Sequence, residues 1–484
     1  MNIPRILLAA GASGSGKTLI TCGILQALVN RGKKVASFKC GPDYIDPMFH
    51  SRVIGTKSRN LDTFFTDRET TKYLLAENAA DCDIAVIEGV MGYYDGVGGI
   101  TDKASAYDLA DTTDTPVIFI VNSRGMSISL AAYVKGFLEY RKNSHIRGVI
   151  LNQMSPMLYP RMKKLLEEEF GVQVLGYVPK VEDCVIESRH LGLVLPDEIP
   201  ELKNRLMKLA GVLEKTLDMD GILALAESAE PLEVKENTPD DTWHLPEKVR
   251  IGVADDEAFC FFYEDNFRLL RNMGAELVPF SPLHDRNLPD DLDGMLLYGG
   301  YPELNGSLLE QNETMRQAVS EAIRDGMPCM AECGGFMYLH EKMEGMDGKY
   351  YHMTGVIPGK VYRTPKLTRF GYITLERNHS GEKTDGQEES ENLPGQENPC
   401  ADFFDSCDPG KIQAHEFHYF DSENCGTAFH ASKPASTRGW DCMHSEKRLL
   451  AGFPHLYYYG NPCIPETFLE KCLEYKRERE NIRN

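Results

Sequence analysis

The stretch AAGASGSGKTLIT, residues 9–21, has an apolar run before it and a helix-like pattern after it. Residues 11–18 fit the spacing G-x-x-x-x-G-K-[ST] at every fixed position. Such a loop lets backbone N–H groups close around phosphate oxygens, and the N-terminus of the following helix adds a partial positive charge. The stretch therefore predicts a phosphate-binding loop between a parallel strand and a helix.

The predicted nucleotide-binding residues all lie in this loop and are Gly11, Gly14, Ser15, Gly16, Lys17 and Thr18. Lys17 can reach the outer phosphates, and the Thr18 hydroxyl can bind Mg²⁺. The sequence has no N-K-x-D motif for reading guanine, which disfavours a GTPase.

Carboxylates follow two further predicted strands. KCGPDYIDPMFH (residues 39–50) contains Asp43 and Asp46, and VIEGVMGYYDG (residues 86–96) contains Glu88 and Asp95. Ligands of open parallel sheets bind at the carboxyl ends of the strands, where the phosphate loop also lies. Beside a bound triphosphate, these groups are expected to hold Mg²⁺ and a second substrate, although any single one could be a turn residue or a helix cap.

Length and composition narrow the class of protein. A chain of 484 residues with 42% hydrophobic residues is expected to form two globular domains. Its net charge of −21 argues against nucleic acid or an anionic membrane as the main partner. No apolar run reaches about 18 residues, so no membrane span is expected. The 13 cysteines are scattered without a CxxC pair, which predicts reduced thiols and a cytoplasmic location.

The chain contains two successive regions in which predicted strands alternate with predicted helices. The first predicts a parallel sheet with helices on both faces over residues 1–226, and the second predicts another α/β domain over residues 249–484. The acidic, Pro-containing stretch 227–248 is interpreted as a linker, and the polar stretch 378–399 as a disordered insertion. The predicted strands are Arg5–Ala10, Lys34–Phe38, Ile84–Glu88, Val117–Asn122, Gly148–Asn152, Val172–Tyr177, Val249–Ala254, Glu276–Phe280, Gly294–Tyr298 and Pro328–Glu332, and the predicted helices include Thr18–Arg31, Tyr159–Phe170, Glu264–Gly274 and Leu304–Asp325.

GMPCMAECGGFMYL, residues 326–339, predicts a buried strand that turns sharply into a helix at Cys333. A thiol at such an elbow is exposed to substrate, and the helix N-terminus favours its thiolate. The expected oxyanion donors are the backbone N–H groups of Gly300, Tyr301 and Gly334. A cysteine nucleophile also needs a histidine base, and from the residues alone His415, His418 and His455 stay open for that role.

Taken together, these motifs resemble the glutamine-dependent cobyrinate a,c-diamide synthase family over nearly the whole chain. That family joins a dethiobiotin-synthetase-like ATP domain to a class I, flavodoxin-like glutamine amidotransferase domain. The segments that carry the resemblance are the phosphate loop, KCGPDYIDP, EGVMGYYDG, SRHLGL (residues 188–193), DEAFCFFYEDN (residues 256–266), GGYPEL, AECGGFMYL and HEFHY.

The resemblance implies a cytoplasmic ligase of cobalamin biosynthesis that uses ATP and Mg²⁺. L-glutamine would be hydrolysed at Cys333, ammonia would pass inside the protein, and ATP would activate the a and c acetate carboxylates of cobyrinate as acyl phosphates. It also implies that Thr18, Asp46 and Glu88 hold the metal, and that Asp43, Tyr44 and Asp95 meet the macrocycle.

The resemblance favours His455 as the general base, with His418 as the second choice. Class I amidotransferases have a Glu two positions after this histidine, and here that position is Tyr457, so the third member of the catalytic set stays open. Related tetrapyrroles (hydrogenobyrinate, nickel sirohydrochlorin or the remaining carboxylates of cobyric acid) are alternative substrates. A partitioning-type ATPase fused to a degenerate amidotransferase is an alternative of another class. The oligomeric state also stays open, with a homodimer as one option.

Overall fold

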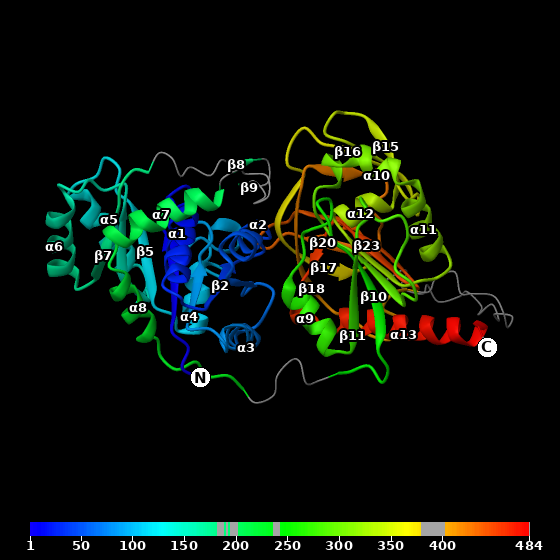
Figure 1. Cartoon of the computed structure of the whole chain (residues 1–484), viewed down its shortest axis with the longest axis horizontal. Coiled ribbons are helices and arrows are strands. Elements are labelled where there is room, and N and C mark those ends of the chain that lie inside the picture. Colours follow the sequence, from blue (N-terminus) through cyan, green and yellow to red (C-terminus); the bar gives the residue numbers. More distant parts are fainter. Residues whose placement is uncertain (182–187, 190–191, 194–201, 236–242, 379–401, 484) are drawn as a thin grey trace. The chain divides into compact units, whose positions relative to one another are not determined.

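Strand β1 (Arg5–Ala10) lies inside a seven-stranded parallel sheet in the computed structural model (Figure 1). Ile6 and Leu8 face a core that helices share, and the alternate residues Leu7 and Ala9 are buried on the other face. Burial on both faces explains why this strand is a continuous apolar run. The sheet order is β3-β2-β4-β1-β5-β6-β7, with β2 (Val35–Cys40), β3 (Lys57–Leu61), β4 (Ile84–Glu88), β5 (Val117–Asn122), β6 (Ile146–Asn152) and β7 (Gln173–Val178).

Helices connect these strands, and their ends follow local sequence signals. Helix α6 (Tyr159–Phe170) carries Pro160 in its first turn and ends at Gly171, whose φ of 64° is a left-handed conformation that favours glycine. The other helical segments described in this unit are α1 (Lys17–Asn30), α2 (Ile45–Phe49), η1 (His50–Ile54), α3 (Arg68–Ala79), η2 (Val97–Gly99), α4 (Ala106–Thr113), α5 (Ser129–Glu139), α7 (Leu202–Thr216) and α8 (Met219–Glu227). Two short strands, β8 (Ser188–Arg189) and β9 (Gly192–Leu193), pair antiparallel.

The second unit is built around a six-stranded sheet of order β11-β10-β12-β13-β23-β22, parallel except for the edge strand β22. Its parallel strands follow the flavodoxin-like order 2-1-3-4-5, as predicted. The strands are β10 (Val249–Ala254), β11 (Ala275–Phe280), β12 (Gly294–Leu297), β13 (Cys329–Glu332), β22 (His444–Glu446) and β23 (Leu449–Gly452), and the helical segments are α9 (Glu264–Asn272), η6 (Pro302–Leu304), α10 (Gly306–Gln311), α11 (Glu313–Arg324), α12 (Gly334–Leu339), η7 (Tyr458–Gly460) and α13 (Cys463–Arg483).

Two further sheets in this unit were not predicted. One is antiparallel, with the order β21-β20-β17-β18-β24, and the other has the order β15-β14-β16-β19. Many of their residues are only partly buried, so they lack the apolar runs that identify parallel strands. Their strands are β14 (His340–Glu344), β15 (Tyr350–His352), β16 (Ile357–Arg363), β17 (Arg369–Arg377), β18 (Ile412–His418), β19 (Phe420–Ser422), β20 (Phe429–Ser432), β21 (Gly439–Cys442) and β24 (His455–Leu456).

The structure describes residues 1–181, 188–189, 192–193, 202–235, 243–378 and 402–483. The chain divides into two units, Met1–Thr238 and Pro239–Asn484, within the predicted linker. Part of that linker, most of SRHLGL and nearly all of the predicted insertion lie outside the described residues. Within the described part, no helix combines the length and apolarity needed to cross a bilayer.

Three local expectations differ from the structure. The predicted helix 304–325 is interrupted at Asn312, whose side-chain amide donates to the carbonyls of Pro282 and Asp285 instead of continuing the helix. Leu232, placed in the linker, exchanges backbone hydrogen bonds of 2.7 and 2.8 Å with Met1. The prediction of reduced thiols is wrong for Cys407 and Cys463, which form a disulfide, because sequence spacing did not reveal that the segment before β18 meets the start of α13.

Candidate active sites

The phosphate loop closes at the carboxyl end of β1 and leads directly into α1. Gly14 and Gly16 have φ values of 76° and 86°, which disfavour residues with a Cβ. Asn152, at the end of β6, donates its side-chain amide to the Ser15 carbonyl at 2.8 Å. A Cβ at position 16 would lie 2.4 Å from that amide nitrogen, so the loop conformation requires glycine there.

The two functional side chains of the loop point toward the end of β4. The Lys17 ammonium donates to the Met91 carbonyl at 2.8 Å, and the Thr18 hydroxyl donates to Glu88 Oε1 at 2.6 Å. The structure thus brings together residues 17, 18 and 88, which the sequence predicted to act jointly. Burial, reinforced by the charge of Lys39, lowers the pKa of Lys17 to about 8.

A buried lysine, which the sequence did not single out, holds the carboxylates together. The Lys39 ammonium forms an ion pair with Asp46, lies 3.1 Å from Glu88 Oε1 and lies 3.8 Å from Asp43 Oδ2. Burial alone would lower the pKa of Lys39, but Asp46 and Glu88 outweigh it and raise the pKa. No spacing rule marks a lysine inside a β-strand, so only its place in the KCGPDYIDP stretch could have pointed to it.

The same cluster contains His50, which the sequence also left without a role. Its Nε2 lies 3.4 Å from Glu88 Oε2, and both side chains are fully buried. Burial disfavours the Glu88 carboxylate, but Lys39, His50 and Thr18 together lower its pKa below the ordinary value. Burial raises the pKa of Asp46 against the opposing charge of Lys39.

The residues predicted to contact the macrocycle lie in the segments that follow β2 and β4. Asp43 Oδ1 accepts from the backbone N–H groups of Ile45 and Asp46, so Asp43 also fixes the start of α2. Tyr44 is the residue immediately before that helix and is partly exposed. Asp95 is exposed, and its Oδ2 accepts from the Gly92 N–H at 3.0 Å.

In the second unit, Cys333 occupies the sharp turn between β13 and α12. Its φ of 47° is unusual for a residue with a Cβ, and its N–H donates to the Gly452 carbonyl at 2.8 Å. A Cβ at Gly335 would lie 2.0 Å from the Leu297 carbonyl oxygen, so the turn requires glycine at that position. The expectation of an exposed thiol with a favoured thiolate is wrong for this structure, because Cys333 is buried. Burial raises the pKa of its thiol, and the charges of Glu303 and Glu416 add to this.

His455 is the histidine that the structure places beside the elbow. A Cβ added at Gly299 would lie 3.5 Å from both His455 Nε2 and Cys333 Cβ, so the imidazole and the cysteine border the same small space. The opposite nitrogen, Nδ1, lies 3.5 Å from Glu332 Oε2. The ring of His415 stacks on His455 with centroids 4.8 Å apart.

His418 faces other partners. Its Nδ1 donates to the Phe420 carbonyl at 2.6 Å, its Nε2 lies 3.4 Å from Glu416, and its ring stacks on Phe453 at 4.0 Å. The geometry therefore favours His455 over His418 as the partner of the thiol.

The expected oxyanion donors differ in availability. The Tyr301 N–H donates to the Ala258 carbonyl at 3.0 Å, so it would have to break that bond to serve an oxyanion. A Cβ at Gly334 would lie 3.1 Å from the Gly300 nitrogen, and the Gly334 N–H forms a hydrogen bond that lowers the pKa of Cys333. The Gly300 nitrogen therefore lies close to Gly334, the residue that follows the thiol.

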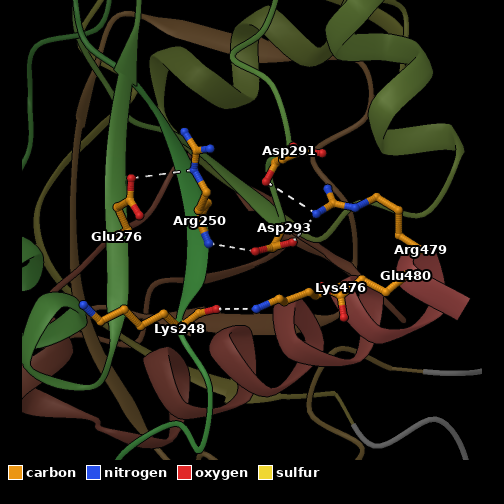
Figure 2. Close-up of a pocket in the computed structure, with 8 residues that line it drawn as sticks. All are labelled: Lys248, Arg250, Glu276, Asp291, Asp293, Lys476, Arg479 and Glu480. Atoms are coloured by element: carbon orange, nitrogen blue, oxygen red, sulfur yellow. Dashed lines mark hydrogen bonds and ion pairs between the residues drawn. The ribbon is translucent and has the colours of Figure 1, made fainter. Parts of the chain in front are cut away.

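A cavity in the second unit lies at the opposite, N-terminal edge of the parallel sheet (Figure 2). Asp293 precedes β12, and it pairs with Arg479 from α13 at 2.8 Å. Charged side chains of both signs line this cavity, without a thiol or an imidazole. It is therefore a poor candidate for the reaction that Cys333 suggests.

Known proteins match both units. Residues 6–193 match the CobQ/CobB/MinD/ParA nucleotide binding domain, and residues 250–461 match the CobB/CobQ-like glutamine amidotransferase domain. The chain is 37% identical to the cobyrinate a,c-diamide synthase of Thermoplasma volcanium over 99% of this chain and 100% of that protein. It is 35% identical to that of Caldanaerobacter subterraneus over 98% and 100%, and 36% identical to that of Priestia megaterium over 99% of both chains. The resemblance seen in the motifs is confirmed, and the chain belongs to the cobyrinate a,c-diamide synthase family.

Proposed function

We propose that this chain is an ATP-dependent, glutamine-hydrolysing ligase that amidates the a and c acetate carboxylates of cobyrinate in cobalamin biosynthesis. The observation that carries the proposal is the presence, in one chain of this family, of a complete phosphate loop and an elbow cysteine bordered by an imidazole. An amide bond needs an activated acid and a nitrogen nucleophile, and these two sites are suited to supply one each.

In the first unit, a substrate carboxylate attacks the γ-phosphorus of ATP and forms an acyl phosphate, with ADP as the leaving group. This step is needed because a carboxylate is a poor acyl donor, whereas phosphate leaves readily. Lys17 and the backbone of the loop bind the phosphates. Asp43, Tyr44 and Asp95 are the groups we assign to holding the macrocycle and orienting its acid.

Magnesium fits this site by the chemistry of its donors. Thr18 Oγ1 and Glu88 Oε1 lie 2.6 Å apart. The carboxylates of Glu88 and Asp46 both accept hydrogen bonds from the Lys39 ammonium. Mg²⁺ in nucleotide sites is usually held by one or two protein oxygens together with substrate phosphates and water. Thr18, Glu88 and Asp46 would hold Mg²⁺, which neutralises phosphate charge when bound.

In the second unit, His455 takes the thiol proton and Cys333 attacks the glutamine amide. The Gly300 and Gly334 N–H groups are placed to stabilise the oxyanion. Ammonia leaves with a proton from His455, and water then releases glutamate from the thioester. We propose that the ammonia passes inside the protein to displace phosphate from the acyl phosphate, which yields the amide.

A product assay with separate macrocycles tests this function. Purified protein is incubated with ATP, L-glutamine and either cobyrinate, hydrogenobyrinate, nickel sirohydrochlorin or cobyric acid, and products are identified by mass. The proposal predicts a diamide from cobyrinate with the highest kcat/KM. Preference for another macrocycle would reassign the substrate, and ATP turnover without glutamate release or amide formation would refute the ligase.

A further inference from the structure

We propose that Glu332 is the positioning residue of the glutaminase site, holding the His455 imidazole through its Nδ1 atom. This inference rests on the proposed function, because it concerns how the same thiol is activated. Glu332 would take the role of the glutamate that class I enzymes have two positions after the histidine, where this chain has Tyr457. The carboxylate comes here from the residue directly before the nucleophile.

The sheet register brings Glu332 and His455 together. Glu332 is the last residue of β13 and pairs with Gly452, the last residue of β23. His455 follows Gly452 by three residues, after a turn through Pro454. Since the Cys333 N–H also bonds to the Gly452 carbonyl, the nucleophile, the carboxylate and the histidine segment are fixed by one pair of strands.

The imidazole lies between the carboxylate and the thiol. Nδ1 faces Glu332 Oε2 at 3.5 Å, while Nε2 borders the space beside Gly299 that Cys333 also borders. Catalytic hydrogen bonds are often long in structures without substrate and shorten in the complex. With Nδ1–H directed at the carboxylate, Nε2 is left as the acceptor for the thiol proton, and Glu332 itself takes up no proton.

The residue at the usual position cannot take this role in the same way. Tyr457 donates its hydroxyl to Asp265 Oδ2 at 3.2 Å, and its ring packs edge-on against Tyr263. Its phenol is buried, and burial raises its pKa, so it offers no negative charge to an imidazolium. Glu332 is the acidic group that the structure pairs with His455 Nδ1.

Burial makes the pairing electrostatically strong. Glu332 is 3% exposed, and its Oε1 has no hydrogen-bond partner among the described residues. Burial raises the pKa of Glu332, while His455 and the Leu456 backbone oppose that rise. The other titratable groups around the thiol, the imidazole and the carboxylate include His415, Tyr263, Tyr298, Tyr458, Glu303 and Glu416.

The test compares Glu332→Gln with Glu332→Asp in the full-length protein. Glutaminase kcat and the pH profile of Cys333 alkylation by iodoacetamide are measured for each. Glu332→Gln should lower kcat about 10²-fold with little change in KM. Because the carboxylate stabilises the imidazolium–thiolate pair, its loss should move the thiolate limb of the Cys333 alkylation profile to higher pH by about one unit or more. Glu332→Asp, which keeps the charge, should restore part of both.

Asp293→Asn is the matched control. It makes the same acid-to-amide change on another buried carboxylate of this unit, at the opposite edge of the sheet (Figure 2), and should leave the alkylation profile unchanged. Equal alkylation profiles for wild type and Glu332→Gln would overturn the inference, even if kcat fell. Absence of glutaminase activity in wild type would instead refute the proposed function.

Discussion

The two candidate sites satisfy their buried charges in different ways. At the phosphate loop, Lys39 and His50 meet Asp46 and Glu88 inside the unit, so carboxylates and cations already compensate one another. At the cysteine elbow, a thiol whose charged form is disfavoured by burial shares its space with one imidazole. Under the proposed function, the first site receives an anion and a metal, whereas the second creates its own ion pair before it reacts.

This difference also separates the expected failures. A lost cation at the phosphate loop removes binding and activation of the acid, which every nitrogen source needs. A lost group at the elbow removes only the supply of nitrogen from glutamine. When glutamine is replaced by ammonium, variants of the elbow should therefore regain amidation activity, whereas variants of the phosphate loop should not.

The strongest loss is expected for Cys333→Ala. Without a nucleophile, glutamine-driven amidation should fall by at least about 10⁴-fold, while amidation with high ammonium continues. Product mass and glutamate release measure both. Cys329→Ala, four residues earlier at the start of β13 and buried in the core, is the control and should keep glutamine-driven activity. Loss of the ammonium reaction in Cys333→Ala would contradict separate sites.

Lys17→Ala should disable the other site. Removing the ammonium that faces the outer phosphates should reduce amidation about 10³-fold with either nitrogen source. Lys33→Ala, an exposed lysine beyond α1, should behave as wild type. Amidation that survives in Lys17→Ala would refute the ATP role of this loop.

A pair of histidine variants tests the assignment of the base at the elbow. His455→Asn should reduce glutaminase kcat about 10²-fold, because the thiol loses its proton acceptor. His418→Asn should change kcat much less, since both nitrogens of His418 face other partners. Steady-state glutamate release distinguishes the two, and the reverse ranking would move the base to His418.

The smallest expected effect is the change in nucleotide affinity with pH. With a pKa of about 8, Lys17 loses its charge as the pH rises through that value, so the Kd for ATP should increase about tenfold between pH 7 and pH 9. Calorimetric titration at several pH values measures this. Lys17→Arg keeps its charge over the range and should show a flatter dependence; the same slope in both proteins would assign it to another group.

The sequence predicted the contiguous parts of both sites. The phosphate loop lies within eight residues, and the elbow is one strand and one turn, so local spacing identified each. The sequence did not identify Lys39 and His50, because their contacts with Glu88 depend on β2 and η1 packing beside β4. The pairing of Glu332 with His455 depends on the register of β13 with β23, which no local pattern contains. The antiparallel sheets were missed because partly exposed strands lack a strong periodic signal.

Isotope labelling can show whether nitrogen released at the thiol becomes the amide of the product. Protein, ATP and cobyrinate are incubated with glutamine labelled with ¹⁵N in the amide, together with an equal concentration of unlabelled ammonium. The two-site mechanism predicts a diamide in which both new nitrogens are predominantly ¹⁵N in wild type and ¹⁴N in Cys333→Ala. A wild-type diamide built mainly from ¹⁴N would show that the thiol does not supply the amide nitrogen, and the coupling of the two sites would be refuted.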